Sequence, residues 1–322
     1  MSESVARTVA RRADVAGSVG MRAREPDRRG FVDRDGVKVA WELFARDLPA
    51  GAPTVFLLPT WAIIHSRFWK GQVPDLARRY RVLTMDNRGN GRSDRPTELA
   101  QMTLAQTVAD CIAVMDATET QAAVLVGLSM GGAYALRLAA LHPERVVGAI
   151  LVGPSVGGFG HDFEGREEFD FEAELPTDEG RAKSNRHYWL RDWPGYARWF
   201  FAEMYQEPHS TKQVEDAVGW ALETTPETIL TLEDAGGEPG ANLGSSPELA
   251  AMVRCPVLVV HGSADQIVEP SVGEELAAAM GAEFLLLEGA GHNPFGRDPV
   301  RMNLIIRDFV TRVTGPRQGS SH

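Results

Sequence analysis

The sequence predicts an α/β domain in which a mostly parallel central sheet has helices on both faces and carries a helical lid insertion. Two observations predict this fold class. Short apolar runs without polar alternation are separated by helical segments, which is the pattern of parallel strands buried on both faces. This alternation stops at Pro154 and resumes after Val253, so a single sheet is interrupted by an insertion.

The expected strands are runs of β-branched and aliphatic residues bounded by turn-forming residues. They lie at 38–46, 54–59, 80–86, 122–128, 146–153, 256–262 and 283–289. The expected core helices lie between and after these strands, at 67–79, 102–117, 130–142, 270–280 and 298–314.

These elements divide the chain into a core, an insertion and two tails. Residues 31–153 and 254–315 are expected to form the α/β core, and residues 154–253 the helical lid. Residues 1–30 are expected to be a disordered N-terminal tail, and residues 316–322 a C-terminal tail. The arginines near the N-terminus have no apolar h-region beside them, so we predict no secretory signal there.

The composition excludes several classes of partner. With 322 residues, 43% of them hydrophobic, the chain can bury a sizeable core. Its net charge of −11 argues against a nucleic-acid partner, because a phosphate backbone requires a basic surface. No apolar run reaches the ~18 residues of a membrane span. We therefore expect a cytoplasmic protein, monomeric or homodimeric, that acts on a small molecule.

The sequence indicates neither a metal nor a cofactor. The two cysteines, Cys111 and Cys255, make no disulfide framework and no CxxC pair, and both are expected to be small core residues. The glycines at 127–132 match neither a dinucleotide fingerprint nor a phosphate-binding loop with its lysine.

A serine stands where an expected strand turns into an expected helix. Gly127 and Gly131 lie two positions to either side of Ser129. A sharp strand-to-helix turn strains the serine backbone and exposes its hydroxyl, and glycines are needed where side chains would collide with the neighbouring strand and helix. Taken alone, the same residues also fit a glycine-rich turn whose serine caps a helix.

An acid and a histidine follow two later strands and favour the catalytic interpretation. Asp265 lies in the loop after the strand at 256–262, and His292 lies in the loop after the strand at 283–289. Because ligands gather beyond the carboxyl ends of parallel strands, we expect these side chains to meet Ser129. A serine needs a base, and the base needs an acid to hold its tautomer, so Ser129, His292 and Asp265 are the predicted catalytic triad.

These motifs resemble the α/β-hydrolase superfamily over about residues 31–315, and most of all its lidded esterase, lactonase and C–C hydrolase branch. The similar stretches are GLSMGG, DNRGNGRSDRP, LHPERV and HGSAD, at 127–132, 86–96, 141–146 and 261–265. The resemblance implies an α/β-hydrolase fold and an acyl-enzyme mechanism, but it names no substrate.

The chain departs from this family after its expected strand at 54–59. Pro59 and Thr60 stand where most relatives carry His-Gly. The resemblance then implies that the backbone N–H groups of Trp61 and Met130 form the oxyanion hole. Because a β-branched threonine lacks the conformational freedom of glycine, we expect a reshaped hole. The Trp61 side chain is also a candidate substrate contact.

The insertion is rich in aromatic residues over 187–205. Such a stripe usually packs between lid and body, but lidded pockets are predominantly apolar, so some rings should face the substrate. We name Trp189, Trp193 and Trp199 as candidates, together with His65, for which a surface position is an equal alternative.

The sequence therefore predicts a serine hydrolase that cleaves an ester, lactone or thioester with a bulky apolar acyl part. A cyclase or acyltransferase, or a C–C bond hydrolase, would use the same triad. A ligand-binding protein without catalytic activity is the alternative from another class.

Overall fold

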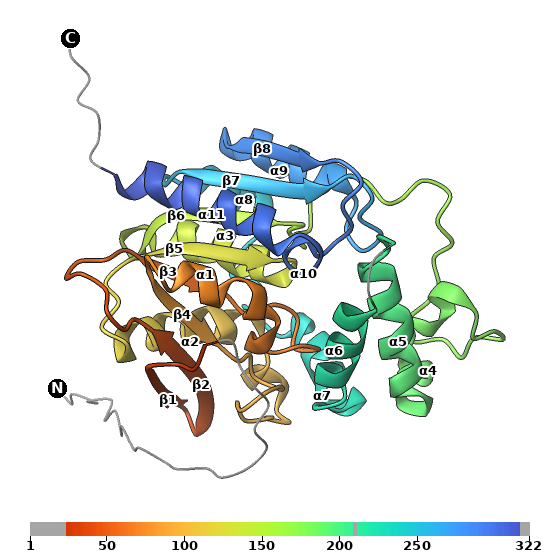
Figure 1. The fold of residues 1–322 in the computed structure, drawn as a ribbon. Helices are drawn as coiled ribbons and strands as arrows, with labels where there is room; N and C mark the ends of the chain where they lie inside the picture. The colour runs from red at the N-terminus through yellow and green to blue at the C-terminus, as the bar shows by residue number, and fades with distance from the viewer. Residues whose placement is uncertain (1–23, 209–210, 316–322) are drawn as a thin grey trace.

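The computed structural model describes residues 24–208 and 211–315, and these build an eight-stranded sheet with helices on both faces (Figure 1). The strand order is β1-β2-β4-β3-β5-β6-β7-β8, with β1–β2 and β2–β4 antiparallel and every other pair parallel. The strands are β1 (Arg28–Arg34), β2 (Val37–Phe44), β3 (Thr54–Leu57), β4 (Arg81–Met85), β5 (Ala123–Leu128), β6 (Val146–Val152), β7 (Val257–Gly262) and β8 (Glu283–Leu287). The expected mostly parallel sheet is confirmed.

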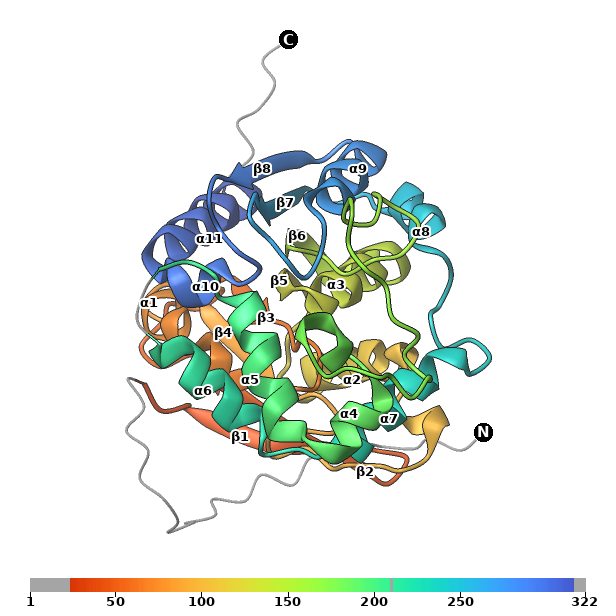
Figure 2. The ribbon, with the colours of Figure 1, turned by 90° about the vertical axis from the view of Figure 1, so that its right-hand side faces the viewer.

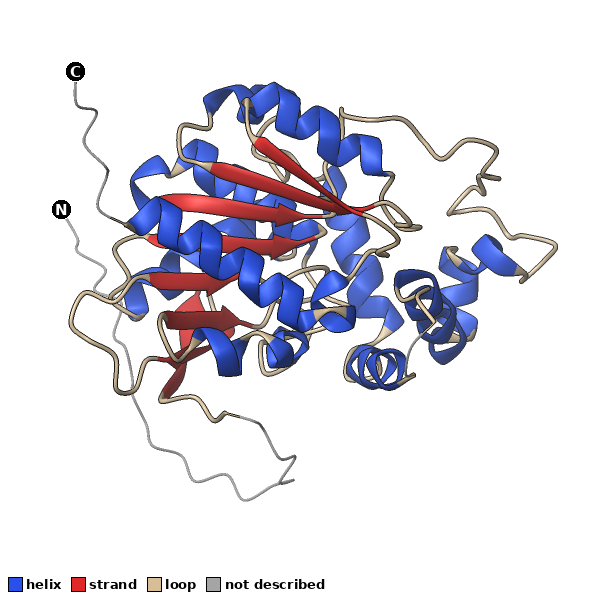
Figure 3. Ribbon diagram, turned by 45° about the horizontal axis from the view of Figure 1, so that its top comes forward, coloured by secondary structure: helices blue, strands red, loops and turns tan. Residues whose placement is uncertain are grey.

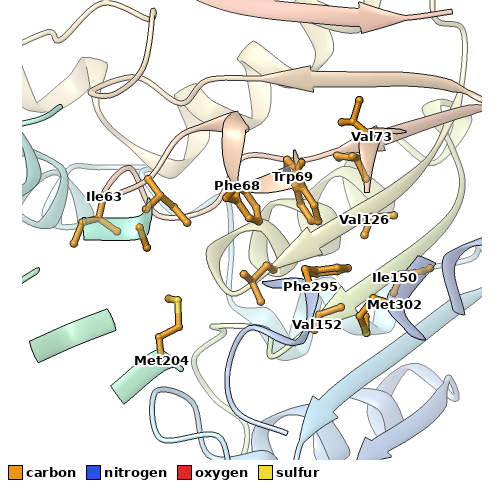
Figure 4. Close-up of a cluster of buried hydrophobic side chains, with 14 of the residues drawn as sticks. Ile63, Phe68, Trp69, Val73, Val126, Ile150, Val152, Met204, Phe295 and Met302 are labelled. Carbon is orange, nitrogen blue, oxygen red and sulfur yellow. The ribbon is translucent and has the colours of Figure 1, made fainter. Parts of the chain in front are cut away.

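The core helices cover both faces of this sheet. One face carries α2 (Leu104–Ala117), α3 (Met130–Leu141), α8 (Ser246–Met252) and α9 (Pro270–Met280), and the other carries α1 (Val73–Leu76), α10 (Pro294–Arg297) and α11 (Pro299–Thr314). Successive residues of β5 alternate between the two cores. Val126 packs with Trp69 and Phe295 in the cluster of Figure 4, whereas Leu125 joins Tyr134 on the opposite face.

Two local differences from the expected elements have physical causes. The helix expected at 67–79 is split into a 3-10 turn, η1 (Ser66–Gly71), and α1. Pro74 has no N–H to continue a helical hydrogen-bond ladder from η1, so the two pieces are separate. The strand β1 was not expected at all, because its residues are alternately exposed and half-buried and form no apolar run.

The expected tails are described only in part. Residues 1–23 and 316–322 lie outside the described residues. Residues 24–30, expected in the disordered tail, include the start of β1, which pairs with β2 from Arg28 opposite Leu43. Just before it, the Asp27 carboxylate accepts hydrogen bonds from the Ala45 and Arg46 N–H groups. The N-terminal strand therefore begins before residue 31.

Helices of the insertion lie beyond the arrowhead ends of the central strands in Figure 1, and Figure 2, which views the molecule from that side, shows them in front. They are α4 (Arg186–Arg191), α5 (Trp193–Met204), α6 (Lys212–Ala221) and α7 (Pro226–Asp234). Between β6 and α4 the chain runs mostly as loop, drawn in tan in Figure 3, with one 3-10 turn, η4 (Gly180–Lys183). Helix α8 falls inside the range 154–253, yet it packs against α3 and α9 of the core.

Candidate active site

Ser129 occupies a strained turn between β5 and α3. Its backbone has φ 55° and ψ −117°, a conformation that costs a non-glycine residue on the order of 1–3 kcal/mol. A Cβ on Gly127 would lie 2.1 Å from the Gly131 carbonyl oxygen, and a Cβ on Gly131 would lie 2.7 Å from the Pro59 oxygen. The turn therefore requires both glycines, and it leaves Ser129 partly exposed.

Asp265 and His292 are joined by a short hydrogen bond. Asp265 Oδ2 lies 2.7 Å from His292 Nδ1, and both side chains are buried. The other carboxylate oxygen, Oδ1, accepts the N–H groups of Ile267 and Val268 at 2.7 and 3.0 Å. Burial acts to raise the pKa of Asp265, but the charge of His292 and the hydrogen bonds from His261 and His292 outweigh it. The pKa of Asp265 is therefore held well below its ordinary value, and the group is a carboxylate.

The end of β6 lies between this pair and Ser129. The Ser129 N–H donates to the Val152 carbonyl at 2.9 Å. A Cβ on the next residue, Gly153, would lie 3.2 Å from both Asp265 Oδ2 and His292 Nδ1. The Ser129 backbone and the Asp265–His292 pair thus both lie beside the end of β6, as expected for residues that follow neighbouring parallel strands.

The second ring nitrogen of His292 has no hydrogen-bond partner in the described part of the chain. Nε2 is buried and makes no hydrogen bond to any described residue, Ser129 included. A buried nitrogen without a partner is costly, so it marks a place where a hydroxyl or a substrate atom can bind. Catalytic hydrogen bonds are often long before substrate binds, so Ser129 and His292 can still act as nucleophile and base without this contact.

Thr60 fits into its loop with a backbone conformation that does not require glycine. It is not among the described non-glycine residues with positive φ. Its hydroxyl donates to the Leu128 carbonyl at 2.8 Å, and its own carbonyl accepts Asn87 Nδ2 at 3.1 Å. The first bond ties the loop before Trp61 to Leu128, the residue before Ser129, and the second ties it to Asn87 in the loop after β4.

The two expected oxyanion donors are the backbone N–H groups of Trp61, directly after Thr60, and of Met130, directly after Ser129. Met130 is the first residue of α3, so its N–H has no acceptor within its own helix. The Trp61 N–H makes no backbone hydrogen bond among the described residues. Neither amide donates a backbone hydrogen bond within the described ranges, so each can donate to a ligand oxygen.

The Trp61 side chain contacts the insertion. Its ring centroid lies 5.3 Å from that of Phe200 and 5.9 Å from that of Trp189. Its Nε1–H donates to Glu233 Oε1 at 2.8 Å. Burial raises the pKa of Glu233 in spite of this bond, although part of the side chain stays accessible to water. Of the candidate substrate contacts, Trp61 and Trp189 are brought together.

The remaining candidates pack elsewhere. Trp193 is buried and donates to the Ala221 carbonyl at 3.0 Å, which holds α5 against α6. Trp199 is half-buried beside Tyr196. His65 is buried, not on the surface, and its Nε2 lies 3.3 Å from a carboxylate oxygen of Glu223, just after α6.

Sequence reasoning missed residues of the insertion that hold the histidine loop. Glu207 Oε1 accepts the Gly291 N–H at 2.8 Å, directly before His292. Asn293 Nδ2, directly after it, donates to the Tyr205 hydroxyl at 2.7 Å. No sequence signal marks these contacts, because the partners lie about 85 positions apart in unrelated elements.

A cavity of about 390 Å³ opens beside the Asp265 loop. Its walls come from the loop after β6, the loop after β7 and the start of α9, and include Ser155, Phe163, Arg166, Ile267 and Val272. The Ser155 N–H donates to the Ser129 carbonyl, so the cavity adjoins the serine turn.

The described part of the chain shows no group of three or more histidine, cysteine or acidic side chains arranged to hold a metal ion. None of its helices combines the length and apolarity needed to cross a lipid bilayer.

Comparisons with known proteins agree with this architecture. A family model described as "alpha/beta hydrolase fold" matches residues 53–299. The AB hydrolase superfamily protein YisY of Bacillus subtilis (strain 168) is 27% identical over 281 residues, covering 83% of this chain and 94% of that protein. The 2-hydroxymuconate semialdehyde hydrolase of Pseudomonas sp. (strain CF600) is 44% identical over 85 residues, 26% of this chain and 30% of its own. Among solved structures, the esterase RhEst1 from Rhodococcus sp. ECU1013 matches with a TM-score of 0.71 at 25% identity, covering 88% of this chain and 98% of that one.

Proposed function

The chain belongs to the α/β-hydrolase family, and on that premise we propose that it is a serine hydrolase acting through an acyl-enzyme. Its substrate is an ester, lactone or thioester with a bulky apolar acyl part. The observation that carries the proposal is the buried His292–Asp265 hydrogen bond, which leaves His292 Nε2 without a hydrogen-bond partner among the described residues.

The first half of the reaction forms the acyl-enzyme. His292 Nε2 takes the Ser129 hydroxyl proton while Oγ attacks the acyl carbonyl carbon. The Asp265 carboxylate holds the Nδ1–H tautomer and stabilises the imidazolium that forms. The N–H groups of Trp61 and Met130 bind the oxyanion, and each such donor is worth about 10²–10³ in rate. When the tetrahedral intermediate collapses, the leaving group departs with the proton from His292.

The second half releases the acyl group. Water enters where the leaving group was, and His292 Nε2 removes its proton as it attacks the acyl carbon. Collapse breaks the bond to Ser129 Oγ, which recovers its proton from His292. The acid product leaves and the starting enzyme is restored.

A C–C bond hydrolase is the second candidate. The 44% identity to 2-hydroxymuconate semialdehyde hydrolase favours it, although only over a quarter of the chain. A cyclase or acyltransferase would replace the water of the second half with another nucleophile. Product mass separates these reactions, because hydrolysis adds one water to the substrate and cyclisation does not.

The experiment that tests the proposal is intact-mass analysis after incubation with a fluorophosphonate probe. We expect one adduct on the wild type, none on Ser129→Ala, and one on the control Thr97→Ala, which removes an exposed hydroxyl. An adduct that persists on Ser129→Ala, or full ester hydrolysis by that variant, would refute the proposal. No adduct on the wild type would favour a ligand-binding protein.

A further inference from the structure

A second histidine contacts the acid of the proposed triad. His261 lies near the end of β7 and is fully buried. Its Nε2 is 3.1 Å from Asp265 Oδ2 and 3.1 Å from the Val268 carbonyl oxygen. Both neighbours are acceptors, so Nε2 must carry a hydrogen and donate it to them.

The other nitrogen of His261 indicates that the ring is neutral. Nδ1 is buried and has no hydrogen-bond partner among the described residues. A proton there would be a buried donor without an acceptor, which is costly. A Cβ on Gly273 would lie 2.4 Å from Nδ1, so the glycine of α9 makes the room in which this ring sits. His261 is therefore a neutral donor that points at Asp265.

With His261 in place, each carboxylate oxygen of Asp265 accepts two hydrogen bonds. Oδ2 accepts from His292 at 2.7 Å and from His261 at 3.1 Å, while Oδ1 accepts two backbone N–H groups. Each donor stabilises the carboxylate charge and lowers its affinity for a further proton. A carboxylate that shares its charge in this way pulls less strongly on the His292 proton.

Other ionisable groups near the pair contact its loops but not its carboxylate or imidazole. Arg166 donates to the Gln266 carbonyl, Glu207 accepts the Gly291 N–H, and the Tyr205 hydroxyl accepts from Asn293. His261 is thus the described side chain, besides His292, that bonds directly to Asp265.

We propose that His261 is a positioning residue: it fixes the Asp265 carboxylate through Oδ2 and limits how strongly that carboxylate binds the His292 imidazole. The effect is to limit how strongly the carboxylate stabilises the His292 imidazolium. The inference rests on the proposed function for its kinetic consequence, but the hydrogen bonding it describes can be measured without turnover.

The kinetic test compares two substitutions of His261. His261→Leu removes the donor, whereas His261→Gln places an amide N–H near the position of Nε2. We expect His261→Leu to lower kcat/KM about tenfold with little change in KM, because a hydrogen bond to a charged group is lost. The midpoint of the acid limb of its pH profile should rise by about 0.5–1 pH unit, and His261→Gln should restore it. An acid limb unchanged in His261→Leu would overturn the proposal.

The structural test is NMR of ¹⁵N-histidine-labelled protein. In the wild type we expect His261 protonated on Nε2 and not on Nδ1, and a low-field His292 Nδ1 proton that moves further downfield in His261→Leu. A protonated Nδ1 on wild-type His261 would overturn the proposal even if the leucine variant did not fold. If the fluorophosphonate fails to label wild-type Ser129 but these signals behave as expected, the proposed function fails and the role of His261 in holding Asp265 stands.

Discussion

Replacing Gly262 by alanine should displace the histidine loop. Gly262 is the last residue of β7, and it faces the backbone of the loop that carries His292. A Cβ at this position would lie 2.2 Å from the Ala290 carbonyl oxygen and 2.4 Å from that of Gly291. Carbon–oxygen contacts below about 3.3 Å are rare, so the loop must retreat by about 1 Å. No flexible side chain can absorb this movement, because both clashing atoms belong to the backbone.

The expected cost follows from that displacement. A shift of about 1 Å in a catalytic group can reduce the rate about 10²-fold. It also stretches the 2.7 Å bond between His292 and Asp265 and should destabilise the fold by about 1–3 kcal/mol. We would measure kcat/KM on an activated ester, the rate of fluorophosphonate labelling, and urea unfolding.

The matched control is Gly157→Ala. A Cβ there would meet nothing within 4 Å, so activity and stability should match the wild type. If Gly262→Ala labels and turns over within about threefold of the wild type, the loop does not position His292 as described and the reasoning is wrong.

Two further predictions concern the acid and the loop before Trp61. The lowered pKa of Asp265 means that its ionised form stabilises the folded state above about pH 4, and that this stability is lost as the pH falls towards the folded-state pKa. The difference in unfolding free energy between wild type and Asp265→Asn should therefore become smaller as the pH falls from about 6 to about 3. Urea unfolding of both proteins measures this difference. A difference that grows on acidification would contradict the prediction. Thr60→Val removes the hydroxyl that donates to the buried Leu128 carbonyl, so it should cost about 1–2 kcal/mol of stability and lower kcat. Thr60→Ser keeps the hydroxyl and should retain wild-type kcat; equal losses in both variants would show that the hydrogen bond is not responsible.

The insertion is hydrogen-bonded both to Trp61 and to the loop that carries His292. Glu233 binds the Trp61 side chain, and Glu207 binds the backbone directly before His292. Carboxylates from two separate parts of the insertion thus contact the expected oxyanion loop and the histidine loop. A movement of the insertion would be transmitted to both, because each contact is a direct hydrogen bond.

The sequence by itself determined the features whose chemistry is local. Unbroken apolar runs between helices predict a parallel sheet, since only strands buried on both faces can be apolar throughout. The glycines around Ser129 predict a strained turn, which the structure has at φ 55°. The proximity of Asp265 and His292 could be predicted from the sequence, because the carboxyl ends of neighbouring parallel strands lie at one edge of the sheet.

Only the tertiary structure decided what depends on distant partners. The strand β1 has no apolar run and exists because β2 offers it an edge to pair with. Trp61 and Glu233 are 172 positions apart, and nothing in either neighbourhood indicates the other. From the sequence, His261 is indicated only as one residue of a buried strand. Its role depends on the Val268 carbonyl, the Asp265 rotamer and the space left by Gly273, and only folding places these around one imidazole.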